Sequence, residues 1–159
     1  MNVIEGGCSC DSVRYSLLDK PMFTHCCHCH LCQQLTGSAF IINSSIEGSN
    51  FKLNKGNLTN FVGPSGSGSK HKLKRCSKCG DPIVSYFGQT EYLAWIKVAS
   101  LDNPDLFPPQ AHIFVNTKLK WLLIGDEIPQ FSGIYNFKET WPLSSYKRLS
   151  LVRKKQTAL

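Results

Sequence analysis

The stretch His25-Cys26-Cys27-His28-Cys29-His30-Leu31-Cys32 places four cysteines and three histidines within eight residues. Thiolate sulfur and neutral imidazole nitrogen are the ligands that a borderline-soft metal such as Zn²⁺ takes in proteins. An ordinary core or surface has no need for so many of these side chains in one place. The stretch therefore predicts a metal site, and the four other cysteines of the chain predict a second one that holds the fold around it.

The composition indicates one folded domain in a reducing compartment. The chain has 159 residues, of which 42% are hydrophobic and 11% aromatic, as is typical of a globular protein. Its amino terminus does not resemble a signal peptide, and its longest apolar runs are too short to span a bilayer. We therefore expect a cytoplasmic protein without a membrane partner, in which clustered cysteines are metal ligands and not disulfides. The net charge of +7 favours anionic partners, either nucleic acid or a small acidic metabolite.

Short apolar runs between glycine, proline and asparagine turns predict a mainly β fold. The expected strands lie at 13–17, 39–42, 51–55, 58–61, 71–75, 83–87, 92–99, 112–115 and 120–124. We expect Gly56-Asn57 as the turn between two of them and Gly88-Gln89 as another turn. The residues from Leu31 to Leu35 are expected to form one helical turn ended by Gly37. The sequence shows no long stretch of helical periodicity.

Two segments show no clear pattern. The glycine- and serine-rich segment 63–69 is expected to be a plain surface connection, although a mobile rim over a pocket is the alternative. In the segment 136–159 the two alternatives are packing on the domain through Trp141 and Tyr146 or free extension, and disorder is expected at its end. The basic residues there, at 147–155, are most simply a solvated face.

The eight cysteines fall into three groups: Cys8 with Cys10, the central four, and Cys76 with Cys79. A structural zinc takes four protein ligands, whereas a reactive zinc takes three and keeps one position open. The two distant pairs would form a closed four-thiolate site. Adjacent Cys26 and Cys27 face opposite ways in an extended chain, which leaves Cys27, Cys29 and Cys32 as the better open set. Spacing alone also permits two closed sites, in which each outer pair shares an ion with two central cysteines.

Several of these motifs together resemble one known family, the glutathione-dependent formaldehyde-activating enzymes, which includes centromere protein V. The resemblance covers about residues 5 to 131 in order. It rests on Gly7-Cys8-x-Cys10, Val13-Arg14-Tyr15, Cys27-His28-Cys29-x-x-Cys32 with Thr36-Gly37, Phe51, Gly56, Arg75-Cys76-x-x-Cys79-Gly80, Leu101-Asp102, Pro109-x-x-His112-Ile113 and Trp121.

The resemblance implies a β-tent, Mss4-like fold with two zinc ions. In this family the positions of Cys8, Cys10, Cys76 and Cys79 hold a structural ion, and those of Cys27, Cys29 and Cys32 hold the catalytic one. The implied activity is that of a carbon–sulfur lyase, which joins glutathione and formaldehyde into S-hydroxymethylglutathione. The zinc-binding domain would span residues 1–131, followed by a basic C-terminal extension at 132–159.

Three residues of the central stretch have no assigned ligand role. Cys26 is additional to the family pattern; it is either a fourth ligand, a replacement for one, or a small buried apolar side chain, and we expect the last. His28 matches the family motif and is expected to be oriented by a hydrogen bond. His30 is expected at the surface or behind the ligands.

Three thiolates favour thiol chemistry over hydrolysis. Zn²⁺ with three thiolates has a formal charge of −1 and is a weak Lewis acid, but it binds a substrate thiol as the thiolate beside its electrophile. Lys70, Lys72 or Lys74 would be suited to orient anionic glutathione. A zinc deaminase is excluded, because neither His28 nor His30 begins a His-x-Glu motif.

The alternative function is a non-catalytic, zinc-stabilised binding module. Its basic tail would contact nucleic acid or protein. We rank it second, because no strand interleaves aromatic and basic residues as nucleic-acid readers do.

Overall fold

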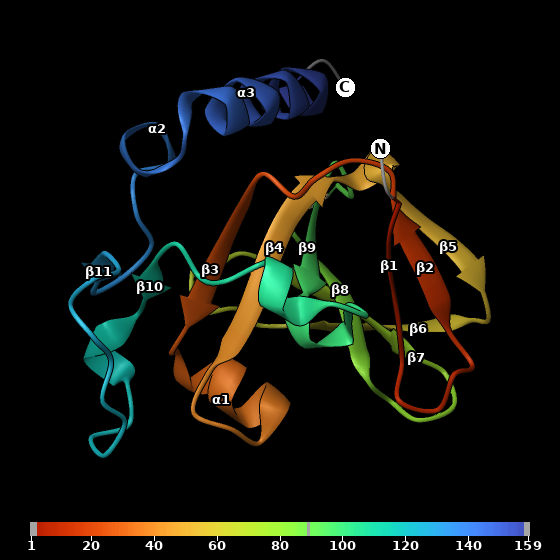
Figure 1. Cartoon of the computed structure of the whole chain (residues 1–159), viewed down its shortest axis with the longest axis horizontal. Coiled ribbons are helices and arrows are strands. Elements are labelled where there is room, and N and C mark those ends of the chain that lie inside the picture. Colours follow the sequence, from red (N-terminus) through yellow and green to blue (C-terminus); the bar gives the residue numbers. More distant parts are fainter. Residues whose placement is uncertain (1–2, 89, 158–159) are drawn as a thin grey trace.

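Two β-sheets dominate the computed structural model, which describes residues 3–88 and 90–157. Within that part of the chain, a three-stranded sheet has the order β1 (Ile4–Gly7), β2 (Arg14–Leu17) and β5 (Phe51–Lys55). An eight-stranded sheet has the order β11 (Gln130–Phe131), β10 (His112–Ile113), β3 (Phe23–Cys27), β4 (Ile41–Glu47), β9 (Leu93–Lys97), β8 (Pro82–Phe87), β7 (His71–Cys76) and β6 (Leu58–Gly63). The expected mainly β fold is confirmed (Figure 1).

Three α-helices and four short 3₁₀ helices accompany the sheets in the described chain. The α-helices are α1 (His30–Thr36), α2 (Phe137–Thr140) and α3 (Leu143–Thr157). The 3₁₀ helices are η1 (Gly48–Asn50), η2 (Val98–Ser100), η3 (Pro104–Leu106) and η4 (Val115–Thr117). Helix α1 ends at Gly37, which has φ 62°, so the expected helical turn and its glycine stop are both confirmed. None of the described helices is long and apolar enough to cross a membrane.

The two faces of the large sheet bury two separate cores. Successive residues of a strand point to opposite faces, so β4 and β9 contribute to both cores. Ile46 and Ile96 pack with Tyr15 of the small sheet in one core. Phe23 and Trp95 pack in the other core, which the C-terminal segment covers. The candidate metal ligands Cys27 and Cys29 belong to this second core.

The residues after β9 fasten the small sheet to the large one. The Arg14 guanidinium donates two hydrogen bonds to the Asp102 carboxylate, at 2.8 and 2.5 Å. The hydroxyls of Tyr15 and Ser100 are 2.7 Å apart. Gly6 pairs with Leu101, and a Cβ there would lie 2.4 Å from the Ser100 carbonyl oxygen, so only glycine allows this approach.

Three strand predictions were wrong in whole or in part. The strands β5 and β6 do not form a hairpin around Gly56: β5 pairs with β2 and β6 with β7, so the chain crosses between the sheets there. Residues 120–124 form no strand, and Trp121 and Leu123 are 70% and 91% exposed. The expected strand at 112–115 stops at Ile113, because Phe114 adopts left-handed backbone angles and η4 follows.

The C-terminal segment packs on the domain, which decides between the two alternatives left open for it. Trp141 is buried and stacks on Phe23 with ring centroids 5.2 Å apart. The missed helix α3 buries Leu149 and Val152 while it exposes Leu151, so its sequence has no broad apolar stripe to reveal it. Gln89, residues 158–159 and the side chains of residues 155–157 lie outside the described structure, and the expected domain boundary at 131 stays a prediction.

Paired substitutions on α3 test this packing. We expect Leu149→Ala to lower the free energy of unfolding by about 2–5 kcal/mol, because it opens a cavity in the second core. Leu151→Ala, two residues away and 61% exposed, should change it by less than about 1 kcal/mol. Urea unfolding at equal metal content measures both values. Equal effects of the two substitutions would mean that α3 does not belong to the core.

Candidate metal centres

The first candidate centre joins two turns that lie far apart in the sequence. Cys8 and Cys10 precede β2, and Cys76 and Cys79 form the turn between β7 and β8. The ligand atoms of all four lie within 4.8 Å of one another. The first pair lies in a tight turn, because residues 9–10 form a turn and Asp11 has φ 55°.

The four sulfurs have the spacing that a tetrahedral zinc requires. The Sγ atoms of Cys8 and Cys10 are 3.4 Å apart, and those of Cys10 and Cys76 are 3.9 Å apart. Sulfurs bound to zinc lie about 3.8 Å from one another. Hydrogen bonds with Ser12 lower the pKa of Cys10 to about 6, which favours the thiolate. The residues therefore fit a closed zinc site.

Backbone amides further stabilise these turns. The Val13 amide donates to Cys8 Sγ at 3.2 Å, and the Lys78 amide donates to Cys76 Sγ at 3.4 Å. The Ser9 amide donates to an Asp81 carboxylate oxygen at 2.7 Å, which links the first turn to the second. Such bonds direct amide dipoles at the sulfurs and hold the turns in the geometry of a metal-binding knuckle.

The second candidate centre lies where β3 passes into α1 (Figure 1). Cys27 ends β3, Cys29 is the N-cap of α1, and Cys32 lies in the first turn of that helix. Their sulfurs are within 4.8 Å of one another. Hydrogen bonds among the thiols lower the pKa of Cys29 and raise that of Cys27. These three donors fit a soft metal ion with one position left open.

A row of polar side chains crosses the sheet beside this centre. His25, Asn43 and Lys97 are register partners on β3, β4 and β9. Lys97 Nζ donates to Asn43 Oδ1 at 2.7 Å in a buried setting. Burial lowers the pKa of Lys97 to about 8, while Cys32 and Cys27 act to raise it. His25 is buried as well, and its Nδ1 lies 2.9 Å from the Tyr135 hydroxyl.

Sequence analysis did not single out this polar row. The available signal was the position of Lys97, which follows Trp95 by two residues on the same face of an apolar strand. A charged residue at a position that faces the core is rare unless it has a partner. The partner itself, a group of thiols that is distant in sequence, could not be read from the strand.

The loop 63–69 lies against the three-cysteine centre and is more than a connection. A Cβ built on Gly66 would lie 3.0 Å from Cys29 Sγ and 3.6 Å from the Phe114 ring. After this loop, β7 begins with His71, whose Nε2 is 2.7 Å from the Ser85 hydroxyl and whose ring stacks on Phe87. Because Gly66 has no side chain, the loop can approach the sulfur closely.

The three remaining residues of the central stretch, Cys26, His28 and His30, differ in how deeply they are buried. Cys26 is buried, as expected, and burial raises its pKa to about 12. His28 is oriented by a hydrogen-bonding contact, since its Nε2 is 2.9 Å from His112 Nδ1. Cys26, His28 and His112 form a third group whose ligand atoms are within 4.8 Å of one another. His30 is exposed at the start of α1.

The lysines expected to orient a substrate are largely engaged elsewhere. Lys72 and Lys74 both pair with the Glu91 carboxylate, at 3.0 and 2.7 Å. One carboxylate facing two ammonium groups leaves a local charge of about +1. Lys70 is exposed at the end of the loop that reaches Cys29.

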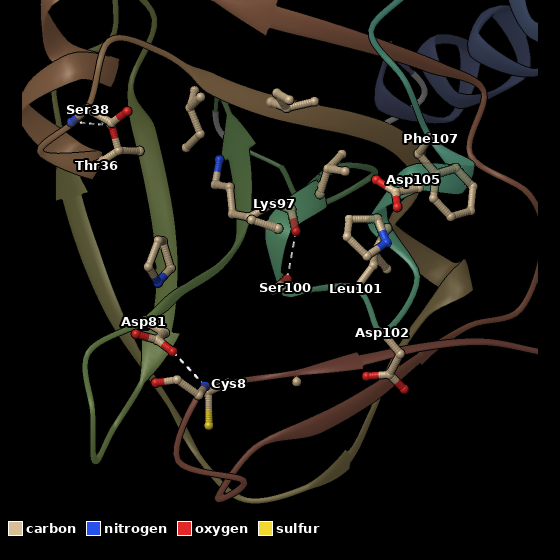
Figure 2. A pocket seen from close by; sticks show the side chains of 18 of the residues that line it. Cys8, Thr36, Ser38, Asp81, Lys97, Ser100, Leu101, Asp102, Asp105 and Phe107 are labelled. Carbon is tan, nitrogen blue, oxygen red and sulfur yellow. Dashed lines mark hydrogen bonds between the residues drawn. The ribbon is translucent and has the colours of Figure 1, made fainter.

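A groove of about 1010 Å³ is lined by residues of both sheets, and none of the three thiols is among its lining residues (Figure 2). Its lining includes Arg14 and Lys97 together with four aspartates: Asp11, Asp81, Asp102 and Asp105. In Figure 2 the Lys97 side chain runs away from Ser100, toward the end of the groove near Thr36 and Ser38. The excess of carboxylates does not favour an anionic ligand in this groove.

The pKa of His71 predicts a pH-dependent stability. Burial lowers it to about 4, below the unfolded value near 6.5. As the pH falls through 6.5 the unfolded chain therefore gains a proton that the folded chain does not, and stability is lost. Because the ring is only half-buried, we expect this histidine to account for about 1 kcal/mol of the loss between pH 7 and 5. Urea unfolding of His71→Gln should show a smaller loss over this range than the parent protein, and equal losses would contradict the assignment.

The chain is similar to one known family and to proteins of known structure. A solved structure, described as a Rhodobacter sphaeroides protein, is 22% identical with a TM-score of 0.49, and the match covers 66% of this chain and 96% of that chain. No curated protein sequence matches significantly. The model of the family described as glutathione-dependent formaldehyde-activating enzyme matches residues 3–117, which is most of the chain. The chain therefore belongs to the family of glutathione-dependent formaldehyde-activating enzymes.

Proposed function

We propose that this protein is a zinc-dependent carbon–sulfur lyase that acts on the adduct of a small thiol and an aldehyde. Glutathione and formaldehyde, which form S-hydroxymethylglutathione, are the proposed pair. Cys8, Cys10, Cys76 and Cys79 would hold a structural zinc, and Cys27, Cys29 and Cys32 a catalytic one. The observation that carries the proposal is the gathering of three thiols in a member of this family, in a group to which the described residues add no fourth protein ligand.

The proposed reaction is an addition that balances without a further reactant. The thiol loses its proton, its sulfur forms a bond to the aldehyde carbon, and the carbonyl oxygen gains a proton to become a hydroxyl. Cys27, Cys29 and Cys32 would hold the zinc ion, which would favour the thiolate form of a substrate thiol without removing its nucleophilicity. The protein must then hold the aldehyde beside the sulfur and limit the cost of the negative charge gathered there.

Lys97 is suited to offset that negative charge. Its ammonium group is buried and donates a hydrogen bond to Asn43 Oδ1. The nearby Cys32 and Cys27 act to raise its pKa, which favours the charged form. A buried cation is costly without an anionic neighbour, and three thiolates bound to a divalent ion supply one formal negative charge. The neutral ring of His25, whose pKa burial lowers to about 3, adds no competing positive charge.

The loop 63–69 forms part of the proposed substrate site. Gly66 touches Cys29, and the same loop ends near the exposed Lys70 and the surplus positive charge of Lys72 and Lys74. An anionic thiol that approached Cys29 along this loop would meet positive charge. The proposed compartment is the cytoplasm, because free thiols persist in a reducing environment and all eight cysteines are free.

The alternative of a nucleic-acid-binding tail receives less support. Arg148 is bound to the Glu47 carboxylate at 2.7 and 2.5 Å and lies 3.3 Å from Asp19. The Arg153 guanidinium lies over the Phe137 ring at 4.7 Å. These two arginines hold the C-terminal segment onto the domain, so less of the basic tail is available to a phosphate backbone.

The activity itself is tested with Cys29→Ser. The parent protein should accelerate the formation of S-hydroxymethylglutathione, measured as the exchange between free and bound formaldehyde by NMR. Cys29→Ser should reduce the rate to background and remove one zinc per chain, while the zinc of the four-cysteine centre stays. Leu151→Ala, an exposed change on α3, is the control. If the parent protein accelerates no reaction across a panel of thiols and aldehydes, the proposal is wrong.

The role of Lys97 is tested by a change of charge at nearly constant volume. We expect Lys97→Met to lower kcat by about tenfold or more, because a loss of about 1.4 kcal/mol of electrostatic stabilisation corresponds to a factor of ten. Lys52→Met on β5, where the side chain is exposed, should leave kcat unchanged. Unchanged kcat in Lys97→Met, with the fold intact by circular dichroism, would exclude the role.

A further inference from the structure

The strand β3 carries metal-ligating side chains on both of its faces. Side chains alternate along an extended chain, so Cys27 and Cys29 share one face while Cys26 and His28 share the other. The backbone stays extended past the end of β3, because the His28 amide donates to the Ile113 carbonyl at 3.0 Å and Cys29 has φ −68° and ψ 151°. The residues that follow His25 are therefore divided between two environments.

The neighbouring strand β10 adds a third ligand to the second of these faces. It runs parallel to β3, and His112 pairs with Cys26 in the register. Directly paired residues on adjacent strands project from the same face. The ligand atoms of Cys26, His28 and His112 consequently lie within 4.8 Å of one another, although His112 is more than eighty positions away in the sequence.

The two imidazoles already have nearly the spacing of metal ligands. His28 Nε2 and His112 Nδ1 are 2.9 Å apart. Two nitrogens bound to one tetrahedral zinc lie about 3.3 Å apart, so only a small separation would admit an ion. Bringing in the ion would replace a single hydrogen bond between the rings by two metal–nitrogen bonds.

The burial of His28 is a second and independent observation. The residue is 0% exposed, and its Nδ1 makes no hydrogen bond of normal geometry. The Ala39 backbone lies within hydrogen-bonding reach of this ring. A histidine that binds a metal through one nitrogen commonly directs the other at a backbone carbonyl, which fixes the ring. The Phe40 ring covers His28 edge-on, with centroids 5.7 Å apart.

We propose that Cys26, His28 and His112 bind a third metal ion, Zn²⁺, on the face of β3 opposite the three-cysteine centre. One thiolate and two neutral imidazoles suit zinc, and they leave a fourth position for a solvent molecule. His112 is half-buried and gives solvent an approach that the buried Cys26 does not. This site does not depend on the proposed lyase activity.

The charges of the two neighbouring centres are compatible. Zinc with three thiolates has a formal charge of −1, whereas zinc with one thiolate and two imidazoles has a formal charge of +1. Opposite formal charges on the two faces of one strand attract each other and do not repel. The third ion would also cross-link β3 to β10, which is a strand of two residues.

The test counts the metal ions of the full-length protein purified with zinc. We expect three zinc ions per chain by plasma mass spectrometry. After exchange with ¹¹³Cd we expect three NMR signals, one of them far upfield because nitrogen replaces sulfur among its ligands. Two ions and two signals in the metal-saturated parent protein would overturn the proposal, and the contact between His28 and His112 would then be only a hydrogen bond.

Three variants assign the third signal. Cys26→Ser and His112→Gln should each remove one ion and the upfield signal while the two sulfur-rich signals remain. His30→Gln, which changes an exposed histidine of the same stretch, should keep all three ions. If the upfield signal survives in His112→Gln, the proposal fails even where Cys26→Ser does not fold.

Discussion

The alternation of side chains along β3 is the constraint on which both candidate sites of this segment depend. The strand lies between β10 and β4, so hydrogen bonds to two neighbouring strands fix which side chains point to each face. One face packs with the aromatic core under the C-terminal segment and presents Cys27 and Cys29. The other presents Cys26 and His28. A shift of one residue in the register would exchange the two sets of ligands, so the hydrogen bonds of β3 determine which thiols meet.

A buried positive charge lies close to the three thiols. Lys97 is one of the few buried charges, and its neighbours are Asn43 and the sulfurs. The nearby histidines His25 and His71 remain neutral, because burial depresses their pKa values to about 3 and 4. One buried cation faces a centre with one formal negative charge. Further cations in this core would be left unpaired, which is the costly arrangement.

The sequence predicted local features well and long-range contacts poorly. Cysteine spacing, the strand pattern and the glycine after α1 are local signals, and they anticipated how the cysteines are grouped. Lys97 was not recognised and His112 was noted only as part of a motif, because their partners lie on other strands and only the register brings them together. The run 120–124 is apolar but has no strand to pair with. Helix α3 was missed, since it buries only a narrow part of its surface.

The other two candidate sites use residues from very short elements, and the two turns of the four-cysteine centre help to hold those elements in place. Strand β10 has two residues and α1 has seven, too few to be stable alone. Their positions depend on the sheet, and the sheet depends on its connection to β1 and β2. The turn of Cys76 and Cys79 joins β7 to β8, while that of Cys8 and Cys10 joins β1 to β2. An ion shared by the two turns would couple the small sheet to the turn between β7 and β8 of the large one, in addition to the fastening by Arg14 and Asp102. Because the four-cysteine centre and the Arg14–Asp102 pair would join the two sheets, the side chains of β3 are not needed for that purpose and can serve as ligands.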